Sequence, residues 1–299
     1  MNSLKANALH GIGFAVLATA CFATLDTTTR HVSAGLSILV ALWFRYAIQA
    51  VITTVVVWPG RGRKILRTQH PRFQLARGLL LFACSTLAFL SLKYMPVGEF
   101  TAVAFISPMI AMMLSGWLLK DHVSASQWWI AGLSFAGALI VIRPGAGIFG
   151  WAVLFPLALA SVNALYQLVT RRLATADEHP VFSQWIGGFI GTVIMSVPLL
   201  WPGSWASNLS AAQWGILVSV GLLGTLGHFF FMKALAIETA AALAPYTYVQ
   251  IGFAMAPGWL VFAHTPDAWA VAGMLVIGLS GFVSGVLRAR SLAAPLHAR

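Results

Sequence analysis

Long apolar runs separated by short polar connections dominate the sequence. An α-helix needs about 20 mostly apolar residues to cross the hydrocarbon core of a bilayer, and each run is close to that length. About ten such runs can be placed, near residues 9–29, 36–58, 74–94, 97–119, 126–143, 149–170, 181–201, 211–234, 240–263 and 268–288. The pattern therefore predicts an all-α integral membrane protein with ten transmembrane helices.

The second half of the sequence repeats the first at an offset of about 140 residues. The segment F-L-S-L-K-Y at 89–94 corresponds to F-F-F-M-K-A at 229–234, and a G-W-L segment begins at both 116 and 258. Five helices in a unit is an odd number, so the second unit enters the membrane from the opposite side. We therefore predict two inverted five-helix repeats, residues 1–146 and 147–299, around a central cavity. Many secondary transporters have this layout.

Composition excludes a water-soluble domain. Hydrophobic residues make up 59% of the chain and charged residues 8%, whereas soluble domains carry about 25% charged residues. The net charge of +11 could suggest a nucleic-acid partner, but the basic residues lie at the ends of apolar runs and form no single face. No nucleic-acid partner is therefore predicted. The sequence also predicts no cofactor and no metal site. Both cysteines lie inside apolar runs, as small packing residues do.

The positions of Lys and Arg predict the orientation of the chain. Most of them fall in connections on the same side as the N-terminus, with a cluster between residues 61 and 77. Because positive residues accumulate on the cytoplasmic side, both termini should lie in the cytoplasm, with the protein in the inner membrane. The basic loop 61–77 should set this topology and contact anionic lipids. A monomer is expected.

Several short motifs occur in a fixed order in both halves. They include Ser107-Pro108, Leu-Lys-Asp-His at 119–122, Phe-Ala-His-Thr-Pro at 262–266, and the basic residues Arg30 and Arg171. This ordered set resembles the drug/metabolite transporter superfamily, in particular its ten-helix EamA-type exporters, with Asp121 and His264 in place of the family's Glu. Length and aromatic content are most similar to the YddG-type aromatic amino-acid exporters. The resemblance implies export of small metabolites by alternating access.

Arg45 is the most informative polar residue of the first half. It lies about nine residues into a predicted helix, hence about 14 Å along it, where an unpaired charge is costly. It could bind a substrate carboxylate, or it could form an ion pair with Asp26 that orients helices 1 and 2. Trp43 and Tyr46 share another face of the same helix and could supply an aromatic wall.

Polar residues of the second half also share helix faces. Asn163, Tyr166 and Gln167 occupy positions i, i+3 and i+4, a face that should line either a cavity or a seam between helices. Tyr246 and Gln250 form a second such face. His228 could carry a proton, contact substrate or hydrogen-bond a neighbouring carbonyl.

These residues lead to one main hypothesis, the export of small amphipathic metabolites, above all aromatic or apolar amino acids. Arg45 would hold the carboxylate, and aromatic residues such as Phe105 would contact the side chain. The predicted substrate-binding set is Trp43, Arg45, Tyr46, Ser85, Phe105, Ser107, Asn163, Tyr166, Gln167, His228, Tyr246 and Gln250, with Asp26 and Arg45 as a structural ion pair or coupling pair.

Two alternatives stay open at the sequence level. An exporter of cationic drugs by proton antiport would need an unpaired buried carboxylate, and Asp26 is the one carboxylate well inside an apolar run. Asp26 could be paired with Arg45, which would leave no dedicated proton-coupling acid. Facilitated export down a gradient is therefore favoured over proton antiport. An intramembrane enzyme would need a pair such as Ser85 with His228, and neither H-E-x-x-H nor G-x-S-x-G occurs. No enzymatic activity is predicted.

Overall fold

The computed structural model describes residues 2–33, 36–61, 68–94, 100, 103–142, 151–176, 180–201, 209–253 and 268–293. These residues form helices and contain no strand. Six of the helices are long and apolar enough to span a membrane by length and composition, and shorter helices cover parts of the other runs, which confirms the all-α membrane fold. The elements are α1 (Asn2–Ser33), α2 (Ile38–Arg61), α3 (Pro71–Tyr94), α5 (Ser107–Leu118), α6 (Ala125–Ile142), η2 (Trp151–Val153), α7 (Leu154–Thr175), α8 (Pro180–Leu199), α9 (Ala211–Ile237), α10 (Ala240–Thr247) and α12 (Ala268–Ala293).

Local sequence explains where several helices begin. Proline occupies the first position of α3 and α8, where its missing N–H costs nothing and its fixed φ suits a helix. Ser210 caps α9 in a capping box, because its side chain accepts from the Gln213 N–H while the Gln213 side chain accepts from the Ser210 N–H. Thr239 caps α10 through the N–H of Ala242.

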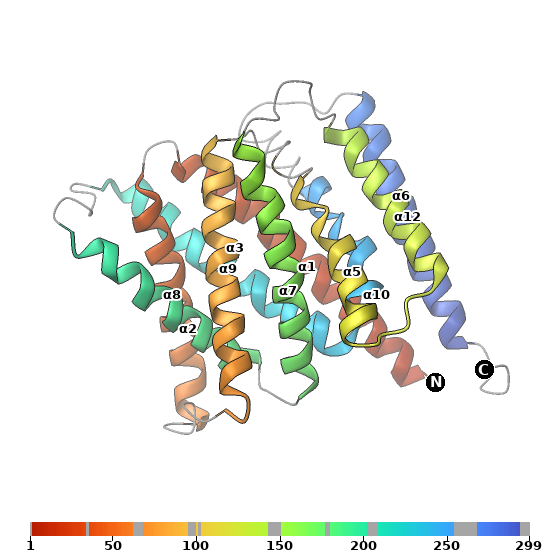
Figure 1. Cartoon of the computed structure of the whole chain (residues 1–299), viewed down its shortest axis with the longest axis horizontal. Helices are drawn as coiled ribbons and strands as arrows, with labels where there is room; N and C mark the ends of the chain where they lie inside the picture. The colour runs from red at the N-terminus through yellow and green to blue at the C-terminus, as the bar shows by residue number, and fades with distance from the viewer. Residues whose placement is uncertain are drawn as a thin grey trace.

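The closest helix pairs join the two halves of the chain. α1 packs on α9, α3 on α7, α2 on α8 and α6 on α12. The counterparts in the two halves are α1 and α7, α2 and α8, α3 and α9, and α6 and α12. When each helix is replaced by its counterpart, the α1–α9 pair becomes the α3–α7 pair, and the α2–α8 and α6–α12 pairs stay the same. In Figure 1, α1 rises from the N-terminus while α7 descends, and α6 lies beside α12, which runs the opposite way. The fold is thus two inverted five-helix repeats.

The inverted arrangement places the start of α1 and the end of α12 at the same edge of the molecule (Figure 1). This edge is called the terminal side below. That it faces the cytoplasm stays a prediction. The repeat limits at residues 146 and 147 also stay a prediction, because residues 143–150 lie outside the described part of the chain.

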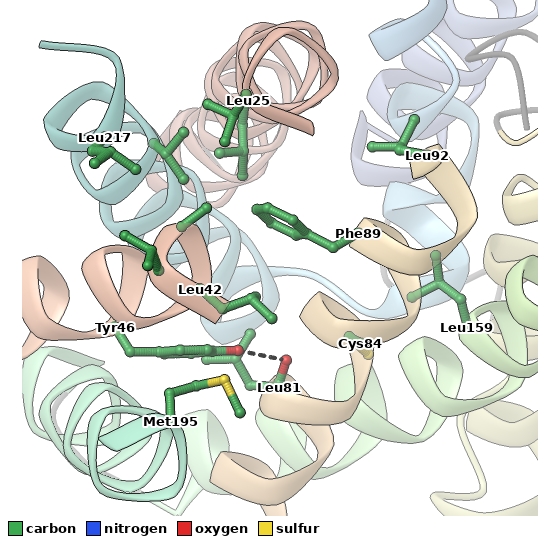
Figure 2. Close-up of a cluster of buried hydrophobic side chains, with 14 of the residues drawn as sticks. Leu25, Leu42, Tyr46, Leu81, Cys84, Phe89, Leu92, Leu159, Met195 and Leu217 are labelled. Atoms are coloured by element: carbon green, nitrogen blue, oxygen red, sulfur yellow. Dashed lines mark hydrogen bonds between the residues drawn. The ribbon is translucent and has the colours of Figure 1, made fainter. Parts of the chain in front are cut away.

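The seam between α2 and α8 is tightly packed. Tyr46 of α2 is fully buried and donates its hydroxyl hydrogen to the Leu81 carbonyl of α3 over 3.1 Å, with Met195 of α8 beside its ring (Figure 2). A Cβ added to Gly191 of α8 would overlap the Tyr46 ring. Glycine is therefore required at this position for the two helices to approach so closely.

The predicted basic loop over residues 61–77 is wrong at its C-terminal end. α3 already begins at Pro71, so Arg77 lies one and a half turns inside a helix. Its side chain is 0% exposed and cannot contact lipid headgroups. Residues 62–67 lie outside the described part of the chain, and lipid contact by the rest of the segment stays a prediction.

Candidate functional site

A cavity of about 190 Å³ lies between α1, α2, α3, α5, α7, α9 and the C-terminal end of α10. On α1 it is lined by residues 19–29 and on α3 by residues 84–92, which are the second halves of both helices. Both helices run away from the terminal side, so the cavity lies in the opposite half of the molecule. The side chains that line it are those of Thr19, Phe22, Leu25, Asp26, Thr29, Arg45, Cys84, Ser85, Ala88, Phe89, Leu92, Phe100, Ala104, Phe105, Ser107, Pro108, Leu159, Asn163, Tyr166, Gln167, His228, Phe231, Thr247 and Gln250.

A buried cluster packs the two repeats together on the terminal side of the cavity. Ala15 and Ala18 of α1, Ala111 of α5 and Ala164 of α7 form one buried cluster with residues of α9 and α10. Further toward the terminal side, the Arg171 guanidinium donates to the backbone carbonyls of Leu235 and Glu238 at the end of α9. Such contacts satisfy carbonyls that a helix end leaves without partners.

Arg45 places a guanidinium at the wall of this cavity. The side chain is 5% exposed and packs over Gly224 of α9, where a Cβ would stand 3.2 Å from Arg45 Nη1. Its Nη2 lies 3.0 Å from His228 Nε2, but its buried Nε has no hydrogen-bond partner among the described residues. The same holds for the hydroxyl of Ser107. A buried donor without a partner is costly, and both residues line the cavity.

The contacts of His228 fix its tautomer. A guanidinium can only donate hydrogen bonds, so Nε2 must accept from Arg45 and carry no hydrogen. The ring is then neutral and its hydrogen is on Nδ1, which lies 3.2 Å from the Tyr166 hydroxyl oxygen. That oxygen also accepts from Arg77 Nη2 over 2.8 Å. A chain of hydrogen bonds thus runs from Arg45 through His228 and Tyr166 to Arg77.

Arg77 anchors this chain outside the cavity. Besides Tyr166, its guanidinium donates to Thr170 Oγ1 of α7 over 3.2 Å and to the Ser183 carbonyl of α8 over 2.8 Å. It also contacts Met232 Sδ of α9. The arginine therefore holds α3, α7, α8 and α9 together. Sequence reasoning missed it, because a basic residue at the start of an apolar run looks like an ordinary cytoplasmic flank.

Asp26 of α1 brings a carboxylate to the same cavity. It accepts a hydrogen bond from Gln250 Nε2 over 3.0 Å. Among the described residues no direct ion pair joins Asp26 to Arg45, although the two opposite charges interact electrostatically. Each charge instead has one neutral partner, His228 or Gln250, and both charges line the cavity.

Most of the predicted site residues line the cavity. Trp43, Tyr46 and Tyr246 do not line it: Trp43 donates Nε1 to Ser196 of α8 over 2.9 Å, Tyr46 belongs to the α2–α8 seam, and Tyr246 is buried elsewhere. The sequence did not predict that Phe22, Phe89 and Phe100 line the cavity. Apolar residues that face a cavity and apolar residues that face lipid give the same pattern of hydrophobic positions along a helix. The predicted residues that line the cavity are Asp26, Arg45, Ser85, Phe105, Ser107, Asn163, Tyr166, Gln167, His228 and Gln250.

Comparison with known proteins identifies relatives along the whole chain. The model of the EamA-like transporter family matches twice, at residues 9–143 and 150–285. The S-adenosylmethionine uptake transporter of Rickettsia felis is 24% identical over 277 residues, covering 93% of this chain and 92% of that protein. The pseudopaline exporter CntI of Pseudomonas aeruginosa is 25% identical over 268 residues, covering 89% and 93%.

The riboflavin transporter of Vibrio cholerae is 25% identical over 285 residues, covering 93% of this chain and 94% of that protein. A solved structure described as "Crystal structure of protein" superimposes with a TM-score of 0.77 and covers 97% of this chain and 99% of its own. At 16% sequence identity that likeness shows the fold alone.

Proposed function

The chain belongs to the EamA-like transporter family and is a multi-pass secondary transporter, and we propose that its substrates are zwitterionic amino acids with apolar or aromatic side chains. The observation that carries the proposal is the presence of Arg45 and Asp26 in one small cavity, each held by a neutral side chain. Proteins of this family are transporters, so the chain is not an enzyme.

An amino acid would meet a partner for each of its three parts. Its carboxylate fits the guanidinium of Arg45 and the hydroxyl of Ser107, which both line the cavity, and hydrogen bonds between charged groups are the strong ones. Its ammonium fits Asp26, which has an acceptor oxygen to spare beside Gln250. The apolar side chain fits the phenylalanines of the wall, such as Phe89 (Figure 2).

The size of the cavity favours a small substrate. Its volume of about 190 Å³ lies below the range of about 300–1,000 Å³ for pockets that hold drug-sized ligands. The relatives are named for S-adenosylmethionine, pseudopaline and riboflavin. S-adenosylmethionine carries the same amino and carboxylate groups as an amino acid on a larger body. The proposed substrate therefore keeps that end and has a smaller remainder, as the resemblance to YddG-type exporters also suggests.

Transport would follow alternating access, in which the two inverted repeats rock around the cavity. On the terminal side the alanine cluster packs α1 and α5 of the first repeat against α7, α9 and α10 of the second. We propose that the protein is a monomer in the inner membrane with both termini in the cytoplasm, and that it exports its substrate down a concentration gradient. The names of the relatives include both uptake and export.

Counterflow of labelled phenylalanine in proteoliposomes tests the proposal. Three competitors that share a phenyl group distinguish the contributions of the two charged groups. They are phenylalanine, 3-phenylpropionate, which lacks the ammonium, and phenethylamine, which lacks the carboxylate. Losing a hydrogen bond to a charged group costs about 1.5–3 kcal/mol, so Arg45→Gln should weaken the binding of phenylalanine and of 3-phenylpropionate by about 10- to 100-fold. Asp26→Asn should weaken the binding of phenylalanine and leave the binding of 3-phenylpropionate unchanged.

Arg72→Gln is the matched control, because Arg72 is an exposed arginine of α3 far from the cavity wall. It should leave competition by all three compounds unchanged. Exchange of phenethylamine and of a cationic dye, with no exchange of phenylalanine, would refute the proposal in favour of a carrier for cationic drugs. Undiminished phenylalanine exchange by a folded Arg45→Gln protein would refute the role of Arg45.

A further inference from the structure

We propose that His228 binds a proton together with the substrate carboxylate, so that the carrier moves one proton in the same direction as each substrate molecule. The inference rests on the proposed function, because it requires Arg45 to hold the carboxylate. It gives the protein a second cargo and selects one of the roles that the sequence left open for His228.

The empty site holds His228 in its neutral form. Arg45 Nη2 donates to His228 Nε2 over 3.0 Å, and Nδ1–H points to the Tyr166 oxygen. A second proton on the ring would sit on Nε2 and face an N–H of Arg45, so donor would meet donor and cation would meet cation. Protonation of His228 therefore needs the charge of Arg45 to be compensated.

The other groups around His228 do not supply that compensation. From α3, Arg77 adds a second guanidinium that reaches the ring through Tyr166 of α7, and Cys84 of α3 is neutral as a thiol. From α1, the Phe22 ring packs against the imidazole at a centroid distance of 4.9 Å, and Cys21 lies beside the neighbouring Gly227. Asp26 of α1 lines the same cavity and interacts electrostatically with Arg45, but its single negative charge leaves one of the two guanidinium charges near His228 uncompensated.

A substrate carboxylate at Arg45 would bring the missing negative charge. It would neutralise the guanidinium nearest to His228, and it would offer an acceptor for a new Nε2–H. Carboxylate and proton would then bind cooperatively, and by thermodynamic reciprocity each would raise the affinity of the other by the same factor.

Cooperative binding of two ligands to an alternating-access carrier yields co-transport in one direction. The occupied site carries the carboxylate and the proton across together, and both leave on the far side, where the Nε2–H bond breaks and the proton returns to water. Mutually exclusive binding would instead yield antiport. A proton gradient that is acidic outside would therefore drive substrate inward, and export would require an opposing substrate gradient.

Isothermal titration calorimetry of the purified full chain with 3-phenylpropionate tests the linkage. Titrations in buffers of different ionisation enthalpy, between pH 5.5 and 8, count the protons taken up on binding. We expect up to one proton per ligand and an affinity that falls by up to about tenfold for each pH unit. Asp26 lines the same cavity and could also take up a proton when an anion binds, so substitution of His228 is needed to assign the count. The uncharged analogue 3-phenylpropanamide should bind without taking up protons.

His228→Gln identifies the group that takes up the proton. The amide oxygen can still accept from Arg45 but binds no proton, so both the proton count and the pH dependence of affinity should vanish. His10→Gln changes an exposed histidine of α1 and should keep both. If His228→Gln does not fold, His228→Asn takes its place.

The outcomes separate this inference from the proposed function. Binding of 3-phenylpropionate by the wild type with no proton uptake overturns the inference and leaves the substrate proposal standing. An unchanged proton count in the folded His228 variant also overturns it. No binding of either phenylalanine or 3-phenylpropionate overturns both. In proteoliposomes, accumulation of phenylalanine driven by an acidic exterior supports co-transport, and accumulation driven by an acidic interior refutes it.

Discussion

Replacing Arg77 by methionine should destabilise the helix bundle. Methionine keeps much of the length and apolar character of the arginine stem, so the substitution removes chiefly the guanidinium. Three oxygen acceptors then lose their donor: Thr170 Oγ1, the Ser183 carbonyl and the Tyr166 hydroxyl. They belong to α7 and α8, so the loss weakens the seam between the first repeat and the second.

The expected magnitude follows from these three bonds. Hydrogen bonds between membrane helices average about 0.6 kcal/mol each, and bonds from charged donors in soluble proteins are worth about 1.5–3 kcal/mol. Three bonds give about 2 kcal/mol on the first scale. A buried carbonyl left without a donor adds about 1–3 kcal/mol to the loss of stability. Removing a buried charge offsets part of this loss, because the charge no longer has to be desolvated. We expect a net loss of about 2–4 kcal/mol.

Unfolding in detergent by increasing SDS, followed by tryptophan fluorescence, measures this loss. Arg72→Met is the matched control, because Arg72 lies five residues earlier on the exposed face of the same helix. The control should unfold as the wild type does, and Arg77→Lys should fall between the wild type and Arg77→Met. Equal midpoints for Arg77→Met and Arg72→Met would refute the reasoning that Arg77 joins the two repeats.

Three further changes test the packing and the limits of the cavity. Gly191→Ala should cost about 1–3 kcal/mol in the same unfolding assay, because its methyl group would enter the Tyr46 ring, whereas Gly215→Ala, which meets open space, should be neutral or gain up to about 1 kcal/mol. Trp43→Phe should leave the apparent KM for phenylalanine within about twofold, because Trp43 lies outside the cavity; a large rise in KM would return it to the site. Ser134→Ala and Ser280→Ala break the same 2.6 Å contact between α6 and α12, so the double variant should lose less than the sum of the singles, and strict additivity would contradict a direct bond.

The sequence predicts the helices and one face of the cavity well, because the bilayer imposes strong rules. The length needed to span it locates the helices, and the cost of polar groups in lipid makes the face of Asn163, Tyr166 and Gln167 informative. All three line the cavity. Helical geometry also explains why two of the predicted residues lie outside the cavity. Trp43 and Tyr46 lie two residues before and one residue after Arg45, and such neighbours do not share a face.

The partners of the charged groups could not be predicted from the sequence. Asp26 is the obvious counter-charge for Arg45, but the hydrogen-bond partner of Arg45 Nη2 is His228, 183 residues away. Which of two candidate partners a side chain meets depends on how α2 and α9 cross, and periodicity within a single helix carries no information on that. The same limit applies to Arg77, whose acceptors all come from the other half of the chain.

The fold is symmetric, but the charges of the site are not. At the repeat offset of about 141 residues, Asp26 corresponds to Gln167 and Arg45 to Ile186. Gln167 lines the same cavity as Asp26, so the second repeat presents an uncharged group where the first presents a charged one. The exchange of helix pairs between the halves provides two equivalent conformations, as alternating access requires. The asymmetric charges provide a single binding orientation, because a zwitterion turned end to end would meet charges of its own sign. Substitutions at the symmetric seams should therefore alter the rate of reorientation, and substitutions at Arg45 or Asp26 should alter which molecule is carried.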